Sequence, residues 1–179
     1  MTLTVPCLFG LESLVADEMR RLDLKNVRAE NGRVHCEGTL ADIARLNVNL
    51  RCGARVLMEL GSFPARDFEA LFQGVYALPW ENYIPRDGEF PVKGYSLNSQ
   101  LHSVPACQSI VKKASAKRLG EKYGVETLPE SGSRYQIQFS IIKDVATLYL
   151  DTSGEGLYKR GYRCLLYTSP SPRDGLLSR

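Results

Sequence analysis

Residues 27–38 read VRAENGRVHCEG and contain the clearest hairpin signal in the chain. Two strand-like runs, Val27–Glu30 and Arg33–Glu37, flank Asn31 and Gly32. Both residues of that pair tolerate the positive φ that a two-residue hairpin turn requires. The stretch therefore predicts an antiparallel β-hairpin.

Further elements are predicted on both sides of the hairpin. On the N-terminal side, Thr2–Pro6 is strand-like, and Gly10–Leu22 has apolar residues at spacings of three and four, which places them on one helical face. On the C-terminal side, Thr39 and Asp42 have the spacing of a pair that caps the start of a helix. A further strand is predicted over Arg55–Leu60.

The resulting order is strand, helix, strand, strand, helix, strand. This is the ferredoxin-like βαββαβ arrangement of the α+β class, in which two split βαβ units place both helices on one side of an antiparallel sheet. We expect this unit to cover residues 1–64. A unit of that size is marginally stable alone, so we expect it to rely on the part that follows.

The next part, residues 65–154, is predicted to be a second α+β unit. Its last two strands are predicted to pair across a turn at Lys143 and Asp144, because the first of them alternates apolar and polar residues. The expected elements are a short helix through Phe68–Val75, an edge strand or irregularly paired strand Glu89–Tyr95, a long helix Pro105–Tyr123, and strands Arg134–Ile142 and Val145–Leu150.

Composition excludes several classes of protein. The formal charge is only +3, from 23 Lys and Arg against 20 Asp and Glu, so an anionic partner must be argued from local clusters. No signal peptide and no apolar run of about 20 residues is present, and we expect a cytoplasmic protein with no membrane partner. The five cysteines include no C-x-x-C pair and the two histidines lie far apart, so we expect no metal ion.

Two local clusters have the chemistry to bind RNA. The long helix carries five cations against Glu121, and cations of this kind neutralise phosphates. They spread around the helix, so a solvated helix face is the alternative. Near the C-terminus, Tyr and basic residues alternate, a combination that grips phosphates and stacks on bases, with an exposed linker as the alternative. The residues concerned are Lys112, Lys113, Lys117, Arg118 and Lys122 in the helix, and Tyr158, Lys159, Arg160 and Arg163 near the C-terminus.

No catalytic or cofactor-binding residue is predicted. Gly154 and Gly156 form a G-x-G pair without the continuation that a nucleotide-binding loop needs, so a simple turn is the better interpretation. No Ser or Cys has a histidine placed to activate it, and the carboxylates are scattered along the chain.

Four stretches resemble bacterial class I RNA methyltransferases that carry a THUMP domain, the group that includes 23S ribosomal RNA guanine-N2-methyltransferases. They are PCLFGLESLVADEMRRL, ENGRVHCEG, FPVKGYSLNSQLHSVPACQSIVKKA and LYLDTSGEGLYKRGYR. The resemblance covers residues 1–163, and its most specific part is Leu150–Arg163. It implies a ferredoxin-like unit followed by a THUMP domain, and then the start of a linker over residues 155–163.

In that family the ferredoxin-like and THUMP parts bind RNA, and a following Rossmann-like domain binds S-adenosylmethionine and transfers its methyl group. The cofactor loop and the catalytic Asn/Asp-Pro-Pro motif have no counterpart in this sequence. The resemblance therefore implies a catalytically inactive, truncated N-terminal part, with structured RNA, foremost 23S ribosomal RNA, as partner. It adds Lys93 and Tyr95 to the candidate RNA contacts.

Residues 164–179 lack the periodic spacing of apolar residues that the rest of the chain shows. Cys164–Asp174, CLLYTSPSPRD, can be encoded by one frame of the transposase adapter used in sequencing libraries. We therefore expect residues 164–179 to be a non-native tail, with a flexible native C-terminus as the alternative.

Two other functions stay open at this stage. The chain could act as a stand-alone THUMP adaptor that presents RNA to a separate enzyme, or as the THUMP part of a thiolation or deamination enzyme. The loss of a following domain would also expose apolar surface, which we expect around Trp80 and in the second part of the chain.

Overall fold

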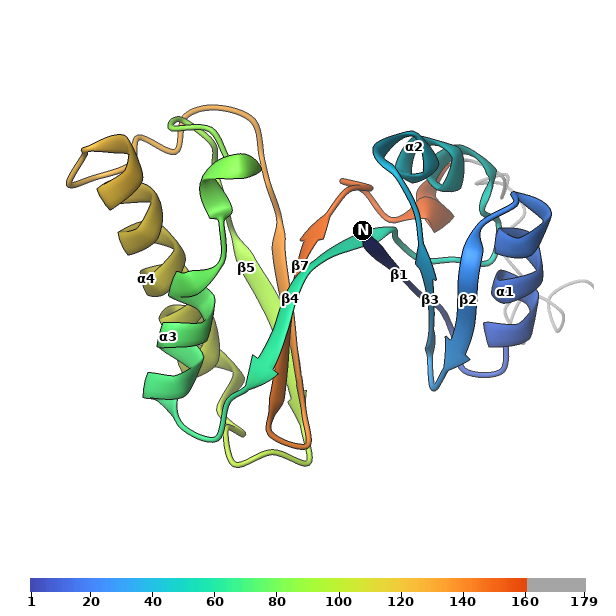
Figure 1. The fold of residues 1–179 in the computed structure, drawn as a ribbon, viewed down its shortest axis with the longest axis horizontal. Coiled ribbons are helices and arrows are strands. Elements are labelled where there is room, and N and C mark those ends of the chain that lie inside the picture. The colour runs from blue at the N-terminus through green and yellow to red at the C-terminus, as the bar shows by residue number, and fades with distance from the viewer. Residues whose placement is uncertain (161–179) are drawn as a thin grey trace, which may run out of the picture. The chain divides into compact units, whose positions relative to one another are not determined.

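A computed structural model describes residues 1–160 (Figure 1). The chain forms two compact units, which are described separately. The first unit contains residues 3–56 together with the segment that starts at Ser153, and the second contains residues 1–2 and 57–152. None of the helices in the described part of the chain is both long and apolar enough for a membrane span.

The first unit contains the predicted hairpin. Its elements are β1 (Thr2–Pro6), α1 (Glu12–Arg21), β2 (Lys25–Glu30), β3 (Arg33–Glu37) and α2 (Leu40–Asn49). The strands lie in the order β2-β3-β1, and β2 pairs with β3 in antiparallel register from Glu30↔Arg33. Gly32 has the expected positive φ of 72°. The hairpin prediction is therefore confirmed.

Local capping explains where α2 begins. The Thr39 hydroxyl accepts a hydrogen bond from the Asp42 main-chain N–H, and the Asp42 carboxylate accepts one from the Thr39 N–H at 2.9 Å. The hydrogen bond from the Thr39 N–H is the largest of the effects that lower the pKa of Asp42. This reciprocal arrangement satisfies two donors that a helix start leaves unpaired, as the sequence predicted.

The second unit is a mixed sheet covered on one face by two helices (Figure 1). Its strands lie in the order β4-β7-β6-β5; β5 and β6 are parallel, and the other neighbours are antiparallel. The elements are β4 (Leu57–Pro64), α3 (Phe68–Ala77), the 3-10 turn η1 (Trp80–Asn82), β5 (Val92–Leu97), α4 (Val104–Tyr123), β6 (Ile137–Ile142) and β7 (Val145–Asp151). A second 3-10 turn, η2 (Leu157–Lys159), belongs to the first unit.

The order βαββαβ is confirmed for the first six elements, but the sixth strand is displaced. It was expected over Arg55–Leu60 and is found at Leu57–Pro64, where it pairs with β7 along its whole length. The residues just before it form other bonds: the Ala54 N–H donates to the Pro6 carbonyl, and the Val56 N–H donates to the Ser153 hydroxyl. The expected boundary at residue 64 stays a prediction.

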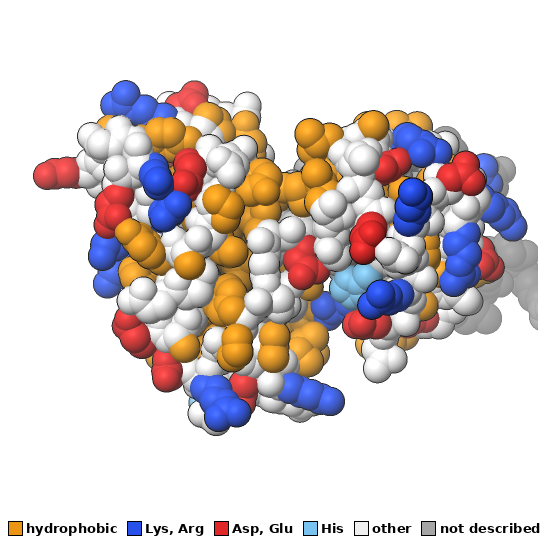
Figure 2. Space-filling model, viewed as in Figure 1, with side chains coloured by type: hydrophobic (Ala, Val, Ile, Leu, Met, Phe, Trp, Pro, Cys, Tyr) orange, Lys and Arg blue, Asp and Glu red, His pale blue; other side chains and the backbone are white. Residues whose placement is uncertain are grey.

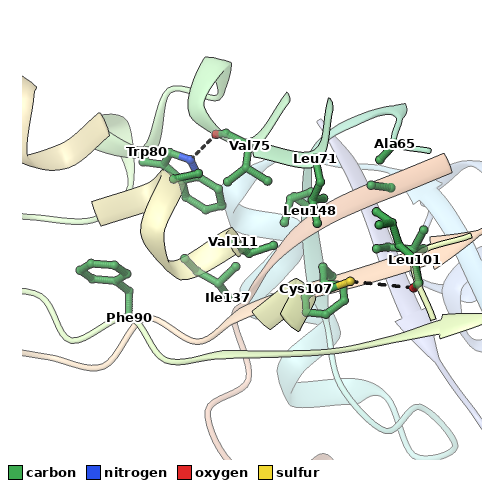
Figure 3. Packing of buried hydrophobic residues seen from close by; sticks show 14 of the residues in the cluster. Ala65, Leu71, Val75, Trp80, Phe90, Leu101, Cys107, Val111, Ile137 and Leu148 are labelled. Carbon is green, nitrogen blue, oxygen red and sulfur yellow. Dashed lines mark hydrogen bonds between the residues drawn. The ribbon is translucent and has the colours of Figure 1, made fainter. Parts of the chain in front are cut away.

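The core of the second unit lies between its sheet and its two helices (Figure 3). Trp80 is fully buried, and its indole Nε1 donates to the Val75 carbonyl at 2.7 Å. Trp80 itself therefore contributes no exposed apolar surface, and the expectation for the rest of the second part stays a prediction. The indole completes the core instead, since its one polar group finds a partner within the same unit.

Candidate nucleic-acid interface

The predicted basic cluster lies on α4, a 20-residue helix that ends at Gly124 with φ 65°. Cys107, Val111, Ala114, Ser115 and Leu119 form its buried face. The five cations occupy the remaining faces, so they do not make a single stripe. Each of them must therefore be considered with its own neighbours.

Lys112 is held by groups outside its helix. Its ammonium lies 2.7 Å from both carboxylate oxygens of Glu130 and 3.2 Å from the Phe90 carbonyl, and 3.5 Å from the centre of the Phe90 ring. This ion pair, hydrogen bond and cation–π contact join α4 to the segments on either side of it. The structure thus gives Lys112 an intramolecular role.

Arg118 and Lys122 share one carboxylate, that of Glu81 in η1. Arg118 donates from Nη2 at 2.7 Å and from Nε at 3.2 Å, and the Lys122 ammonium lies 3.7 Å away. Hydrogen bonding from Arg118 lowers the pKa of Glu81. A two-point guanidinium–carboxylate contact has a fixed geometry, so it anchors α4 to the turn that carries Trp80.

Lys117 and Lys113 lie at the more accessible side of α4. Lys117 is 4.0 Å from Glu121 and lies near the stacked rings of Phe72 and Tyr76. Lys113 is exposed and forms no ion pair within the described residues. It is therefore the α4 cation with the greatest freedom to meet a phosphate.

Both of these lysines border a groove of about 500 Å³ in the second unit. Its lining combines small or aliphatic residues, one threonine, two lysines and three glutamates. These residues are Lys113, Ala116, Lys117, Gly120, Glu121, Val125, Glu126, Thr127, Leu128 and Glu130. Three carboxylates against two ammonium groups do not make a strongly cationic groove. The charges of the groove alone therefore do not predict an anionic ligand.

Lys93 and Tyr95 lie together on the outermost strand, β5, and both are exposed. Their register partners on β6 are Gln138 and Ser140. Gly94, between them, faces the helices, because a Cβ atom there would meet the main chain and ring of Phe139. Lys93 and Tyr95 therefore share the opposite face of the sheet, which α3 and α4 leave uncovered.

The same face carries a row of hydroxyl groups, one from each strand of the unit; Ser140 in this row is buried, and its hydroxyl lies 3.5 Å from that of Tyr149. Tyr95 is opposite Ser140, Ser140 is opposite Thr147, and Thr147 is opposite Ser62. The Ser62 and Thr147 hydroxyls are 3.0 Å apart. Only Tyr95 of this row is predicted from the sequence, because the other members become neighbours through the strand order.

The predicted C-terminal cluster is divided by the structure. Tyr158 is exposed, and the Lys159 ammonium lies 3.4 Å from Glu155. Arg160 donates to the main-chain carbonyls of Val48 and Leu50, at 3.2 and 3.4 Å. Arg163 lies outside the described residues, so its predicted RNA contact stays a prediction.

The described residues do not fit a methyl-donor site. Gly154, with φ 66°, has its carbonyl bonded to Arg55, and Gly156 is buried beside Tyr158. This G-x-G pair therefore lies in a bend that precedes the short 3-10 turn η2 and not at the start of a long helix. Within residues 1–160 there is also no group of three side chains suited to hold a metal ion.

Comparison with known proteins assigns both units. The RlmL ferredoxin-like domain family matches residues 2–57, and the THUMP domain family matches residues 65–151. A Bacillus subtilis protein described as putative RNA methyltransferase YpsC is 42% identical over 164 residues, which is 90% of this chain and 42% of the relative. The ribosomal RNA large subunit methyltransferase K/L of Syntrophotalea carbinolica is 31% identical over 86% of this chain and 22% of its own length.

A solved structure of SMU.472, a putative methyltransferase complexed with SAH, has a TM-score of 0.86 and 44% identity. The match covers 90% of this chain and 44% of that protein. The fold and these matches define a protein in which a ferredoxin-like domain precedes a THUMP domain. The chain corresponds to the N-terminal part of RNA methyltransferases of the RlmL and YpsC type. It spans less than half the length of each of these relatives.

Proposed function

We propose that this chain binds structured RNA and positions it for methylation by an S-adenosylmethionine-dependent catalytic domain. The observation that carries the proposal is the joint match to an RlmL ferredoxin-like domain and a THUMP domain, in the same order as in RNA methyltransferases. The name of the K/L relative supports ribosomal RNA of the large subunit, 23S RNA, as the substrate. Exocyclic N2 of guanine is the methyl acceptor that we favour.

Two sets of side chains are proposed to touch the RNA. Lys93 and Tyr95 offer an ammonium group and an aromatic ring on the uncovered sheet face, and Lys113 offers a cation without an ion pair on α4. An ammonium group neutralises a phosphate, and a tyrosine ring stacks on an unpaired base. The exposed Tyr158 extends this set in the first unit, whereas Lys159, 3.4 Å from Glu155, is a paired cation.

Four of the other predicted contacts have close structural partners. Lys112, Arg118, Lys122 and Arg160 hold carboxylates or main-chain carbonyls of the same unit. A cation that already forms such bonds must give them up before it can bind a phosphate, which reduces its net contribution to RNA affinity. We therefore place these four cations behind Lys93 and Lys113 as phosphate contacts.

This chain alone is proposed to transfer no methyl group. S-adenosylmethionine is the cofactor proposed for the longer relatives, one of which was solved with SAH. The described residues of this chain supply neither a glycine-rich turn for it nor a carboxylate placed to bind its ribose. A stand-alone RNA adaptor, or the THUMP part of a thiolation or deamination enzyme, is the alternative.

The test is an RNA-binding titration of the full chain at several salt concentrations. A 23S ribosomal RNA fragment is expected to bind, with an affinity that falls as salt rises, because phosphate contacts release counterions. Incubation of the same complex with S-adenosylmethionine is expected to leave the RNA unmethylated. Absence of binding at about 50 mM salt would contradict the positioning role. Sequencing the locus downstream of Arg163 separates a methyltransferase from an adaptor.

A further inference from the structure

Helix α2 is apolar on two faces. Its inner face, with Ile43, Leu46 and Leu50 just after its end, packs into the first unit, where Leu46 is fully buried. Its outer face would ordinarily carry polar residues in a soluble protein. This outer face instead carries Leu40 and Val48, which are 70% and 68% exposed.

The exposed residues line up along the helix. Leu40, Ala44 and Val48 are spaced by four, which puts them in one row, and Ala41 borders it. Arg45, the cation within α2, bonds to Asp42 and to the Leu22 carbonyl. We call the row of Leu40, Ala41, Ala44 and Val48 the outer stripe of α2. Figure 2 shows hydrophobic side chains along the upper edge of this unit, where Figure 1 places α2.

The chain returns to α2 after it has completed the second unit. The Ser153 hydroxyl donates to Asn47 at 2.8 Å, the Leu157 N–H donates to the Ala54 carbonyl at 2.9 Å, and the Leu157 side chain is buried. Arg160 then bonds to two carbonyls at the C-terminal end of α2, one of them that of Val48. We call residues 153–160 the docked segment. It ends within hydrogen-bond reach of the last residue of the outer stripe.

We propose that the outer stripe of α2 is the docking surface for the domain that follows the docked segment in the longer relatives. Three observations select this occupant. The stripe is apolar and exposed, the chain ends its docked segment beside it, and the relatives extend well beyond the part that this chain matches. In this proposal the docked segment holds the start of the next domain close to α2. The proposal does not depend on RNA binding.

The test measures how accessible the middle of the stripe is in two proteins. One is the full chain, and the other joins residues 1–163 to the part of the Bacillus subtilis relative that lies beyond its matched region. Ala44→Cys is introduced into both, and its reaction with a thiol reagent is followed by mass spectrometry on the peptide that contains residue 44. We expect the reaction to be at least about ten times slower in the longer protein, because a docked domain excludes the reagent.

Two variants serve as controls. Leu14→Cys places a thiol on α1 at a leucine that is 51% exposed in the same unit, and it is expected to react equally fast in both proteins. Val48→Glu puts a charge into the stripe, and it is expected to restore fast reaction at residue 44 in the longer protein. The same cysteine, at the position that aligns with residue 44 in the intact Bacillus subtilis relative, repeats the measurement in a natural protein.

Three outcomes would overturn the proposal. Equal rates at residue 44 in the short and long proteins would mean that the following domain does not cover the stripe. A slow rate in the full chain that depends on its concentration would make a second copy the occupant. Protection that appears only when RNA is added would assign the stripe to RNA binding. If the protein does not bind RNA but residue 44 is still protected in the longer protein, only the proposed RNA-binding function is rejected.

Discussion

Arg118 in α4 binds the carboxylate of Glu81 in η1 through two nitrogens, across 37 residues of sequence. Side-chain exposure is 22% for Arg118 and 21% for Glu81, so the pair is largely shielded from water. Glu81 directly follows the buried Trp80, and the pair therefore fixes α4 against the part of the chain that closes the core. A cation that looks like an RNA ligand in the sequence has a structural partner in the fold.

The first prediction concerns Glu81→Gln. Hydrogen bonding from Arg118 lowers the pKa of Glu81 from its ordinary value of 4.5. A group with a lowered pKa stabilises the fold above its unfolded pKa, and this contribution is lost as the pH falls through the folded value. Glu81→Gln is thus expected to be less stable than the parent at pH 7, and to lose less stability below about pH 4.5.

Urea unfolding followed by fluorescence measures this difference, because Trp80 is the only tryptophan. Glu126→Gln, at an exposed carboxylate of the loop after α4, is the control and is expected to unfold like the parent. If the parent and Glu81→Gln lose the same free energy of unfolding as the pH is lowered, the ion pair of Glu81 with Arg118 does not stabilise the fold.

The second prediction separates free from paired lysines in RNA binding. Lys93→Ala and Lys113→Ala are each expected to weaken RNA binding and to reduce the slope of log affinity against log salt by about one, the effect of one lost phosphate contact. Lys112→Ala is expected to lower the unfolding temperature, because it breaks the ion pair with Glu130, with a smaller effect on the slope. Salt titrations of RNA binding measure the slope, and thermal unfolding of each variant measures the unfolding temperature.

Lys25→Glu is the control for general charge, since Lys25 is an exposed lysine on β2 of the first unit. Lys93→Glu should reduce RNA binding more than Lys25→Glu does. Equal losses in the two charge reversals would mean that RNA responds to net charge and not to the uncovered sheet face.

The third prediction uses two alanine substitutions on the helix-facing side of β5. A Cβ atom at Gly94 would lie 2.4 Å from the Phe139 carbonyl oxygen, and β5–β6 pairing fixes that oxygen. Gly94→Ala is expected to destabilise the second unit by about 1–3 kcal/mol. Ser96→Ala is expected to be neutral or stabilising, because the buried Ser96 hydroxyl has no hydrogen-bond partner among the described residues.

Urea denaturation of the two variants tests these opposite signs on one strand. A Gly94→Ala protein as stable as the parent would mean that β5 shifts to make room for the methyl group. A clear loss of stability in Ser96→Ala would indicate that the Ser96 hydroxyl forms a bond after all.

The sequence predicted features that depend on neighbouring residues. The turn at Gly32, the Thr39 cap and the end of α4 at Gly124 were all predicted because each depends on φ or on a donor within a few residues. Strand β5 was predicted three residues too early. Its start depends on a distant partner, because the Ile137 N–H bonds to the Pro91 carbonyl and parallel pairing with β6 begins only at Val92.

The candidate site was harder to predict for the same reason. The charge cluster on α4 was counted against Glu121 alone, whereas Glu81 and Glu130 come from other elements and pair with three of its cations. The row of hydroxyls on the uncovered face depends on the strand order β4-β7-β6-β5. Neither the acidic partners nor that order follows from local spacing. The RNA contacts themselves stay a prediction.

The last prediction concerns the thiols. Burial raises the pKa of Cys36 to about 11 and also raises the pKa of Cys107 above its ordinary value of 9.0. Only the thiolate reacts with alkylating reagents, and both side chains are buried. At about pH 8, iodoacetamide is therefore expected to leave Cys36 and Cys107 unmodified in the folded chain and to modify both in urea.

The same pKa shift has a consequence for stability. A raised folded pKa stabilises the fold below the unfolded value of 9.0, and this contribution is lost as the pH rises toward 11. The parent should therefore lose stability over that range, whereas Cys36→Ala should lose less. Cys164, which lies outside the described residues, is replaced by Ser in both proteins so that it adds no signal. Rapid alkylation of Cys36 without urea would contradict its burial, because a thiol kept neutral and shielded cannot react at the rate of a free one.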